Sequence, residues 1–261
     1  MKVFLKLLAT GILTTICRII FQLLLPSSTQ TVLEPSIFVK NGTLPLAFSL
    51  LAIFAYSSIA GLFSLVQSGI SGTSNQQGMK YALALNLVWA VYLFEPLAHA
   101  TSIMLDSVAY VIADGISLFI MGFLLGVFFK CDEKVNSAVK DHKTIILVVI
   151  PIILFVLGRV ILYKVVNIYA VFNTQPLKTF VWCTIVGLVT SLVVIWLTKQ
   201  GQSIVKALLI YAINLIFFNS FMLLVFDFSM IDLAFRTGVD IMAISIGAMI
   251  TIRYRKLIKQ I

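Results

Sequence analysis

The stretch Asp106-Ser-Val-Ala-Tyr-Val-Ile-Ala-Asp114 opens an apolar segment, 103–129, that ends at Phe129. The same arrangement returns late in the chain as Asp232-Leu-Ala-Phe-Arg-Thr-Gly-Val-Asp240, at the start of an apolar segment that ends at Arg253. A helix of about 20 apolar residues is long enough to cross a lipid bilayer. Two aspartates at the same spacing, twice at the start of such a segment, indicate a duplicated membrane protein.

The composition of the whole chain favours a membrane location. Of its 261 residues, 61% are hydrophobic and only 11% are charged, and the mean hydropathy is +1.08. Soluble domains carry roughly 25% charged residues, so a chain this apolar has too few polar side chains to cover its surface in water. We therefore expect an all-α, polytopic integral membrane protein whose surroundings are the lipid bilayer.

Apolar runs predict about eight transmembrane helices. They cover residues 3–25, 45–68, 79–95, 103–129, 144–166, 178–198, 204–226 and 235–252. The third run is short and becomes polar at its end. The first run resembles a signal peptide, but it is long, contains Arg18 and lacks a small-x-small cleavage site, so we expect it to be retained as a membrane helix.

Basic residues fall mostly on one side of these spans. The net charge of +9 alone would suit nucleic-acid binding, but short loops and chain ends rich in Lys and Arg are typical of the cytoplasmic side of a bilayer. The expected cytoplasmic group is Lys2, Lys6, Lys80, Lys130, Lys134, Lys140, Lys143, Lys199, Lys206, Arg253, Arg255, Lys256 and Lys259. The other side has Lys40, Lys164, Lys178 and Arg236. We expect both termini in the cytoplasm, a bacterial inner membrane as the location, and no nucleic-acid partner.

The polar segment 131–143 divides the chain into a first repeat, 1–130, and a second repeat, 144–261. Each half carries an arginine in its first span, Arg18 or Arg159, and each carries one of the two Asp-x7-Asp stretches in its last span. An even number of helices in each half gives the two halves the same orientation in the membrane. The sequence therefore predicts two parallel-oriented four-helix repeats, joined by a cytoplasmic linker and related by an axis along the membrane normal.

Ionisable residues within the expected spans are the main candidates for a functional site. A charge at the centre of a bilayer costs roughly 3 kcal/mol or more, so it normally faces a partner. Asp114 lies about 12 Å inward from the start of its stretch at the helical rise, near the expected depth of Arg18. The same holds for Asp240 and Arg159. We predict the pairs Arg18–Asp114 and Arg159–Asp240, which either lock helices together or bind a solute or ion.

The end of the third span carries a further polar group. Trp89, Tyr92, Glu95 and His99 follow one another at helical spacing, although Pro96 is expected to bend or end the helix. Glu95 has no equivalent carboxylate in the second half. Since histidine titrates near neutral pH, Glu95 and His99 are candidates for binding or relaying a proton. The alternative is an interfacial pair that faces water.

Several other chemistries lack their motifs. The three cysteines, Cys17, Cys131 and Cys183, are far apart and form no CxxC pattern, so no disulfide framework or metal site is indicated. The chain has no phosphate-binding loop, no HExxH motif and no nucleophile elbow, and its two histidines do not suit haem ligation. We therefore expect no cofactor and assign no catalytic residue.

These observations favour a transporter or permease for a small solute or ion, with a polar site between the repeats toward the outer side. The candidate binding residues are Arg18, Trp89, Glu95, His99, Asp114, Arg159 and Asp240. Two other classes of protein stay open. One is a membrane subunit, assembly factor or immunity factor that acts through protein partners. The other is a membrane enzyme that acts on a lipid or quinone, with Glu95, His99 or Asp114 in acid–base roles.

Overall fold

The computed structural model describes residues 2–25, 34–96, 103–130, 148–168, 170–199 and 203–258, and their regular elements are all helices. The long helices are α1 (Val3–Leu24), α3 (Leu44–Ser64), α4 (Ser74–Leu93), α5 (Ile103–Phe128), α6 (Val149–Ile161), α7 (Pro176–Lys199), α8 (Ile204–Val225) and α9 (Met230–Ile258). Shorter pieces are α2 (Ile37–Lys40), a 3-10 turn at Gln67–Gly69 and a π-helical turn at Leu162–Val166 that continues α6. The expected all-α class is confirmed.

Seven of the described helices are long and apolar enough to cross a membrane, which makes the chain a multi-pass membrane protein by length and composition. They are α1, α3, α5, α6 with its π-helical turn, α7, α8 and α9. Helix α4 has 20 residues but is not among them. It opens with Ser74-Asn-Gln-Gln-Gly-Met-Lys80, which makes its first two turns too polar for lipid. The expected count of about eight apolar spans is therefore not confirmed, since seven of the described helices qualify.

Hydropathy did not reveal where α4 starts, because its first turn is defined by a capping box and contains no apolar run. Thr73 Oγ1 accepts a hydrogen bond from the Gln76 backbone N–H at 3.4 Å, and Gln76 Oε1 accepts one from the Thr73 backbone N–H at 3.0 Å. This reciprocal arrangement is a capping box, and it satisfies two backbone donors that the first turn leaves open. The helix thus begins at Ser74, five residues before the apolar run at 79.

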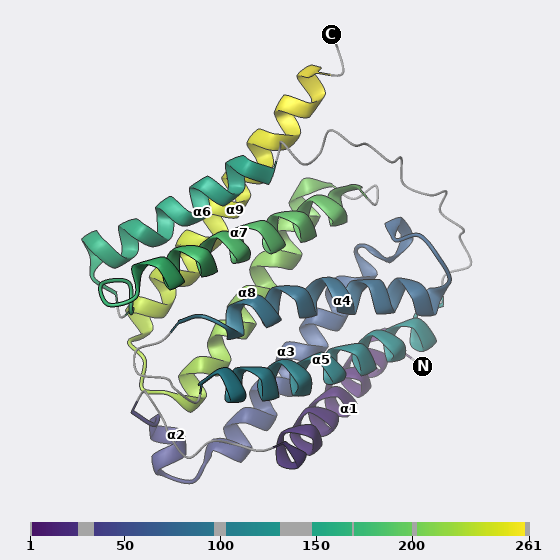
Figure 1. Ribbon diagram of the computed structural model, residues 1–261. Coiled ribbons are helices and arrows are strands. Elements are labelled where there is room, and N and C mark those ends of the chain that lie inside the picture. The colour runs from purple at the N-terminus through teal and green to yellow at the C-terminus, as the bar shows by residue number, and fades with distance from the viewer. Residues whose placement is uncertain are drawn as a thin grey trace.

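The helices form two groups that meet along α4 and α8. Helix α1 packs against α3 and α5, whereas α6 packs against α7 and α9 (Figure 1). Helix α4 contacts α5, α7 and α8, and helix α8 contacts α3, α7 and α9. Both α4 and α8 therefore lie at the centre of the bundle (Figure 1). In α4, polar and aromatic side chains such as Gln77, Tyr81 and Trp89 are buried against these neighbours.

Apolar side chains cover the outside of the bundle in stripes at helical spacing. On α3, Leu46, Leu50 and Phe54 lie four residues apart and are each more than half exposed. On α6, Val149, Ile153, Leu157 and Ile161 form a similar stripe. Such a continuous exposed apolar face is unfavourable in water and suits the hydrocarbon of a bilayer, which is where a membrane helix places its non-packing side.

Helices α4 and α5 approach so closely that their backbones touch. A Cβ atom placed on Gly78 would lie 2.0 Å from the carbonyl oxygen of Gly122, and one placed on Gly126 would lie 2.5 Å from the Cα of Asn75. Only glycine fits at such positions. Small residues at i and i+4, here Gly122 and Gly126, are the usual means of close helix packing within a membrane.

Candidate functional site

Arg159 and Asp240 form a buried bidentate ion pair in the second half of the chain. Arg159 Nε donates to Asp240 Oδ1 at 2.7 Å, and its Nη2 donates to Oδ2 at 2.6 Å. The two side chains are 1% and 0% exposed, so their charges are fully removed from solvent. Arg159 extends from α6 and Asp240 from α9, and these helices pack directly against each other. The pairing predicted from depth is confirmed.

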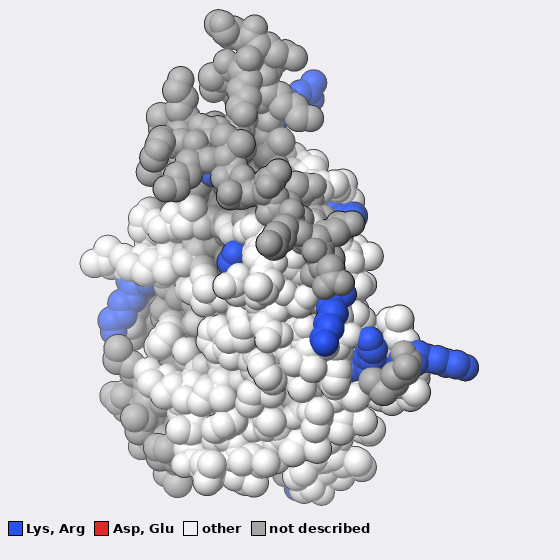
Figure 2. Space-filling view, turned by 90° about the vertical axis from the view of Figure 1, so that its right-hand side faces the viewer, with Lys and Arg blue, Asp and Glu red and all other residues white. Residues whose placement is uncertain are grey.

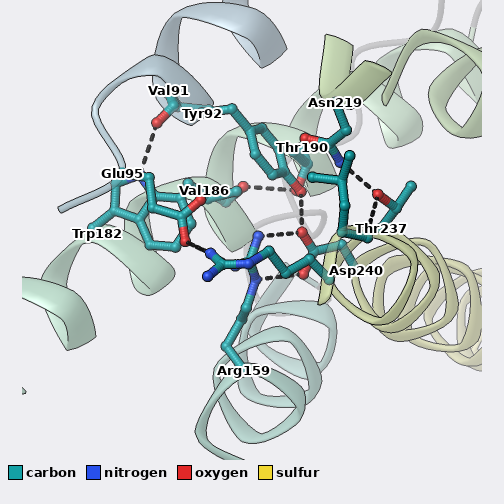
Figure 3. A network of polar contacts seen from close by, with 12 residues as sticks. Val91, Tyr92, Glu95, Arg159, Trp182, Val186, Thr190, Asn219, Thr237 and Asp240 are labelled. Atoms are coloured by element: carbon teal, nitrogen blue, oxygen red, sulfur yellow. Dashed lines mark hydrogen bonds and ion pairs between the residues drawn. The ribbon is translucent and has the colours of Figure 1, made fainter. Parts of the chain in front are cut away.

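Aromatic side chains from the middle of the bundle surround this pair. The Tyr92 hydroxyl of α4 donates to Asp240 Oδ2 at 3.0 Å and lies 3.2 Å from the Tyr211 hydroxyl of α8. The Arg159 guanidinium lies 5.0 Å from the ring centroid of Trp182, within the range of a cation–π contact. Figure 3 shows Tyr92 and Arg159 both directed at Asp240. These contacts fix the carboxylate of Asp240 in one position.

Glu95 joins the pair from the end of α4. Its Oε1 accepts a hydrogen bond from Arg159 Nη1 at 3.0 Å and another from Arg236 Nη1 at 2.5 Å. Figure 3 shows the Arg159 guanidinium between the carboxylates of Glu95 and Asp240. We name Glu95, Arg159, Arg236 and Asp240 the four-charge cluster. Its two arginines and two carboxylates balance to zero net charge.

Tyr163 completes the surroundings of Glu95 from an unusual piece of helix. It lies in the π-helical turn Leu162–Val166, and this turn ends at Asn167, whose φ of 59° is left-handed. The Tyr163 hydroxyl accepts a hydrogen bond from Arg159 Nη1 at 3.2 Å and donates one to Glu95 Oε1 at 3.4 Å. Single π-helical turns are frequent at functional sites, where they re-aim a side chain.

The first half contains a simpler pair. Arg18 Nε donates to the carboxylate of Asp114, and Arg18 Nη1 donates to Gln22 Oε1, one turn further along α1, at 2.8 Å. The rings of Phe48 and Tyr110 each lie 5.8 Å from the guanidinium. Helices α1 and α5 carry the two charges, in the same way as α6 and α9 carry Arg159 and Asp240. This pairing is also confirmed.

The remaining candidates from the sequence are distributed differently. Trp89 does not join a charged group: its indole Nε1 donates to Asn214 Oδ1 at 2.9 Å, and its ring packs among aromatic residues of α3 and α8. His99 lies outside the described residues. The side chain of Asp106 is likewise not described, although its backbone belongs to α5.

Arg236, which the sequence groups with Lys40, Lys164 and Lys178 on the outer side, belongs to the site. It lies on α9 with its side chain 4% exposed, and its Nη1 donates to Glu95. Arg236 and Asp240 are four residues apart on one helix and so share a face. This i, i+4 spacing from Asp240, which was already a candidate, is the signal in the sequence that could have identified Arg236 as a member of the site.

Comparison with known proteins finds no family model, curated protein or solved structure that matches the chain. Within the described residues, no group of His, Cys, Asp and Glu has an arrangement that would hold a metal ion. The site offers guanidinium donors, carboxylate acceptors and tyrosine hydroxyls, most of them buried.

Proposed function

We propose that the protein is a transporter or permease for a small solute or ion. Its polar site would be the four-charge cluster, between the two halves and toward the outer side of the membrane. The proposal depends on one observation: the charged residues of the cluster come from both halves of the chain. Glu95 belongs to the first half of the chain, whereas Arg159, Arg236 and Asp240 belong to the second. Sites of transported solutes commonly lie at such an interface between repeats.

The cluster contains more buried charged residues than are needed to join two helices, which supports a functional role. One buried pair is sufficient to lock a first helix to a last helix, and Arg18 with Asp114 is such a pair. The four-charge cluster adds Glu95 and Arg236, and each additional buried charge carries a desolvation penalty. Ionisable residues that face the interior of a membrane bundle generally mark solute, ion or proton pathways.

The packing pattern supports the proposed pair of four-helix repeats. Helices α1, α3, α4 and α5 would correspond in order to α6, α7, α8 and α9. Each first helix packs on the second and fourth of its own half, and each third helix packs on the fourth. Across the halves, α3 packs on α8 and α4 packs on α7, which is the reciprocal pattern that a two-fold axis produces. In this arrangement α4 would be the eighth span, with Met79, Leu83 and Leu87 on its exposed face and Gln77, Tyr81 and Trp89 buried.

Charge at the ends of the bundle supports the proposed orientation. Figure 2 shows the end at which α1 begins, where Lys and Arg are present and none of the described Asp or Glu side chains appears. Lys6 Nζ there donates to the Phe128 carbonyl at the end of α5, and Lys206 Nζ donates to the Leu65 carbonyl. Glu34, Glu95 and Asp227 lie at the opposite end. With positive residues inside, both termini would be cytoplasmic, in a bacterial inner membrane.

The test is reconstitution of the purified protein alone in liposomes, with charge movement recorded on rapid addition of a solute. The panel comprises small carboxylates, amino acids, organic cations and alkali cations, and empty liposomes are the control. We expect at least one class to give a signal that saturates with concentration. A protein that gives no signal with any class, and that always co-purifies with one partner chain, would instead be a membrane subunit or an assembly factor.

A further inference from the structure

Glu95 is held differently from the other three members of the four-charge cluster. Helix α4 ends at Leu93, and Glu95 follows in non-helical backbone, held by one hydrogen bond from its N–H to the Tyr92 carbonyl at 3.0 Å and followed by Pro96. Its side chain is 19% exposed, whereas those of Arg159, Arg236 and Asp240 are 1%, 4% and 0% exposed. Glu95 is thus the one carboxylate of the cluster that adjoins the surface.

Three donors converge on a single oxygen of Glu95. Arg159 Nη1 from α6 and Arg236 Nη1 from α9 both point to Oε1, and the Tyr163 hydroxyl lies 3.4 Å from the same atom. Guanidinium groups from two separate elements, together with a hydroxyl, are the usual means by which proteins hold a carboxylate. The donors belong to the second half, and only the acceptor comes from the first half.

We propose that Glu95 occupies the place of a carboxylate-bearing solute, which displaces it and binds Arg159, Arg236 and Tyr163. This inference deepens the proposed function and rests on it, because it names the chemical class of the solute. Asp240 would not be displaced, since it is fully buried and is held by a bidentate bond and by Tyr92. The solute site is therefore the position of the Glu95 carboxylate.

Charge balance favours a monoanion, and the converging guanidinium and hydroxyl donors favour a carboxylate among monoanions. Exchanging the Glu95 carboxylate for another single negative charge leaves the net charge of the cluster at zero. A dianion such as phosphate would leave a negative charge uncompensated in a low-dielectric interior, which is unfavourable. A cation would have to approach an oxygen that already accepts hydrogen bonds from two guanidinium groups, and like charges would repel it.

The main experiment is chemical rescue in the Glu95→Ala variant. Removal of the side chain leaves the two guanidinium groups without their shared acceptor and leaves space for a small anion. The purified variant is titrated with sodium acetate and sodium propionate, and with sodium chloride and sodium phosphate at equal ionic strength. Binding is followed by isothermal calorimetry and by the midpoint of thermal unfolding. We expect acetate or propionate to bind at least about tenfold more tightly to Glu95→Ala than to the wild-type protein, because the internal competitor is gone.

Three further variants make the result specific. Glu95→Gln retains the volume and removes the charge, and it replaces Glu95→Ala if that variant does not fold; it too should bind acetate more tightly than the wild type. Adding Arg236→Gln to either variant should weaken acetate binding at least about tenfold, because a charged donor is lost. Asp227→Asn removes an exposed carboxylate at the same end of the bundle, outside the cluster, and should leave acetate binding unchanged.

The outcomes separate this inference from the function on which it rests. Folded Glu95→Ala or Glu95→Gln protein that binds acetate no better than the wild type overturns the inference, and so does protection by phosphate or chloride equal to that by acetate. If the wild-type protein gives saturable signals in liposomes with cations or amines alone, the transporter proposal stands and the carboxylate site is wrong. If it gives none with any solute class, the transporter proposal itself is wrong.

Discussion

At the scale of single residues, the two arginine–aspartate pairs differ both in their own geometry and in their surroundings. Arg18 and Asp114 are joined by a hydrogen bond and are flanked by Gln22 and two aromatic rings. Arg159 and Asp240 share their site with a second arginine and a second carboxylate. We therefore propose that the first pair acts as a structural lock, and that the second, with its additional charges and its adjoining surface, belongs to the binding site.

The lock is tested by removing one partner or both. Asp114→Ala leaves Arg18 buried without its carboxylate, and breaking a buried ion pair in this way costs about 3–5 kcal/mol. We expect a lower unfolding temperature and lower yield for this variant. Replacing both residues, by Arg18→Met with Asp114→Leu, removes both charges and should restore most of the stability. If the double variant were as unstable as Asp114→Ala, the loss of stability would not come from the unpaired charge of Arg18, and the account of the pair as a lock would be wrong.

Much of the residue-level pairing could be predicted, because the low dielectric of a bilayer allows few places for a buried charge. Depth along the helices was sufficient to match Arg18 with Asp114 and Arg159 with Asp240. The partners of Glu95 could not be predicted, since they depend on how the end of α4 meets α6 and α9 across the two halves. The burial of Arg236 could not be predicted either, because the apolar run of its helix begins at about residue 235, whereas the helix itself starts at Met230.

At the scale of the elements, α4 differs from its neighbours in its polar first turns and in its close packing on α5. Its start is set by a capping box, and Gly78 lies against the glycines of α5, while Met79, Leu83 and Leu87 form an exposed apolar stripe on another face. The helix that ends at the four-charge cluster is thus positioned by the contacts of its buried face. Movement of α4 against α5 would carry Glu95 with it.

Close packing of α4 on α5 gives a prediction with an internal control. Gly122→Ala places a Cβ atom 2.6 Å from the Gly78 carbonyl oxygen, so the helices must separate, and we expect a loss of about 1–3 kcal/mol as for other overpacked interiors. Gly238→Ala is the matched control on α9, where an added Cβ meets nothing within 4 Å. This control should be neutral or slightly stabilising, since alanine favours a helix. The midpoint of thermal unfolding of the two purified variants is the measurement. Equal midpoints would contradict the close approach of α4 and α5.

At the scale of the whole molecule, two groups of helices meet along α4 and α8, and the cluster lies where one group contributes a carboxylate to the other. Seven of the eight expected apolar runs correspond to helices that can span a bilayer, because a bilayer requires long apolar runs, whereas the polar first turns of α4 take it out of this set. How the halves pack does not follow from hydropathy, because lipid and protein interiors are similarly apolar. Contacts such as Trp89 with Asn214 and Tyr92 with Tyr211 are properties of the assembled fold.

The proposed orientation is tested by the reactivity of single cysteines in intact cells. With native cysteines replaced, a cysteine at exposed Lys178 or Asp227 should react with a membrane-impermeant maleimide added outside. A cysteine at Lys130 or Lys206, at the lysine-rich end, should react only after the membrane is opened. The reverse pattern would place the four-charge cluster toward the cytoplasm. If the two positions of one set, Lys178 with Asp227 or Lys130 with Lys206, reacted from opposite sides, the proposed arrangement of the spans would be wrong.

The most direct test of the proposed site is the solute-driven signal of Arg236→Gln in liposomes, measured beside the wild-type protein and Asp227→Asn. All three must show equal incorporation and a single folded species. If the four-charge cluster binds the transported solute, we expect Arg236→Gln to lower the apparent affinity at least about tenfold, because a charged donor is lost from the site. Asp227→Asn should match the wild type. Wild-type affinity and rate in Arg236→Gln would contradict the claim that transport passes through the cluster.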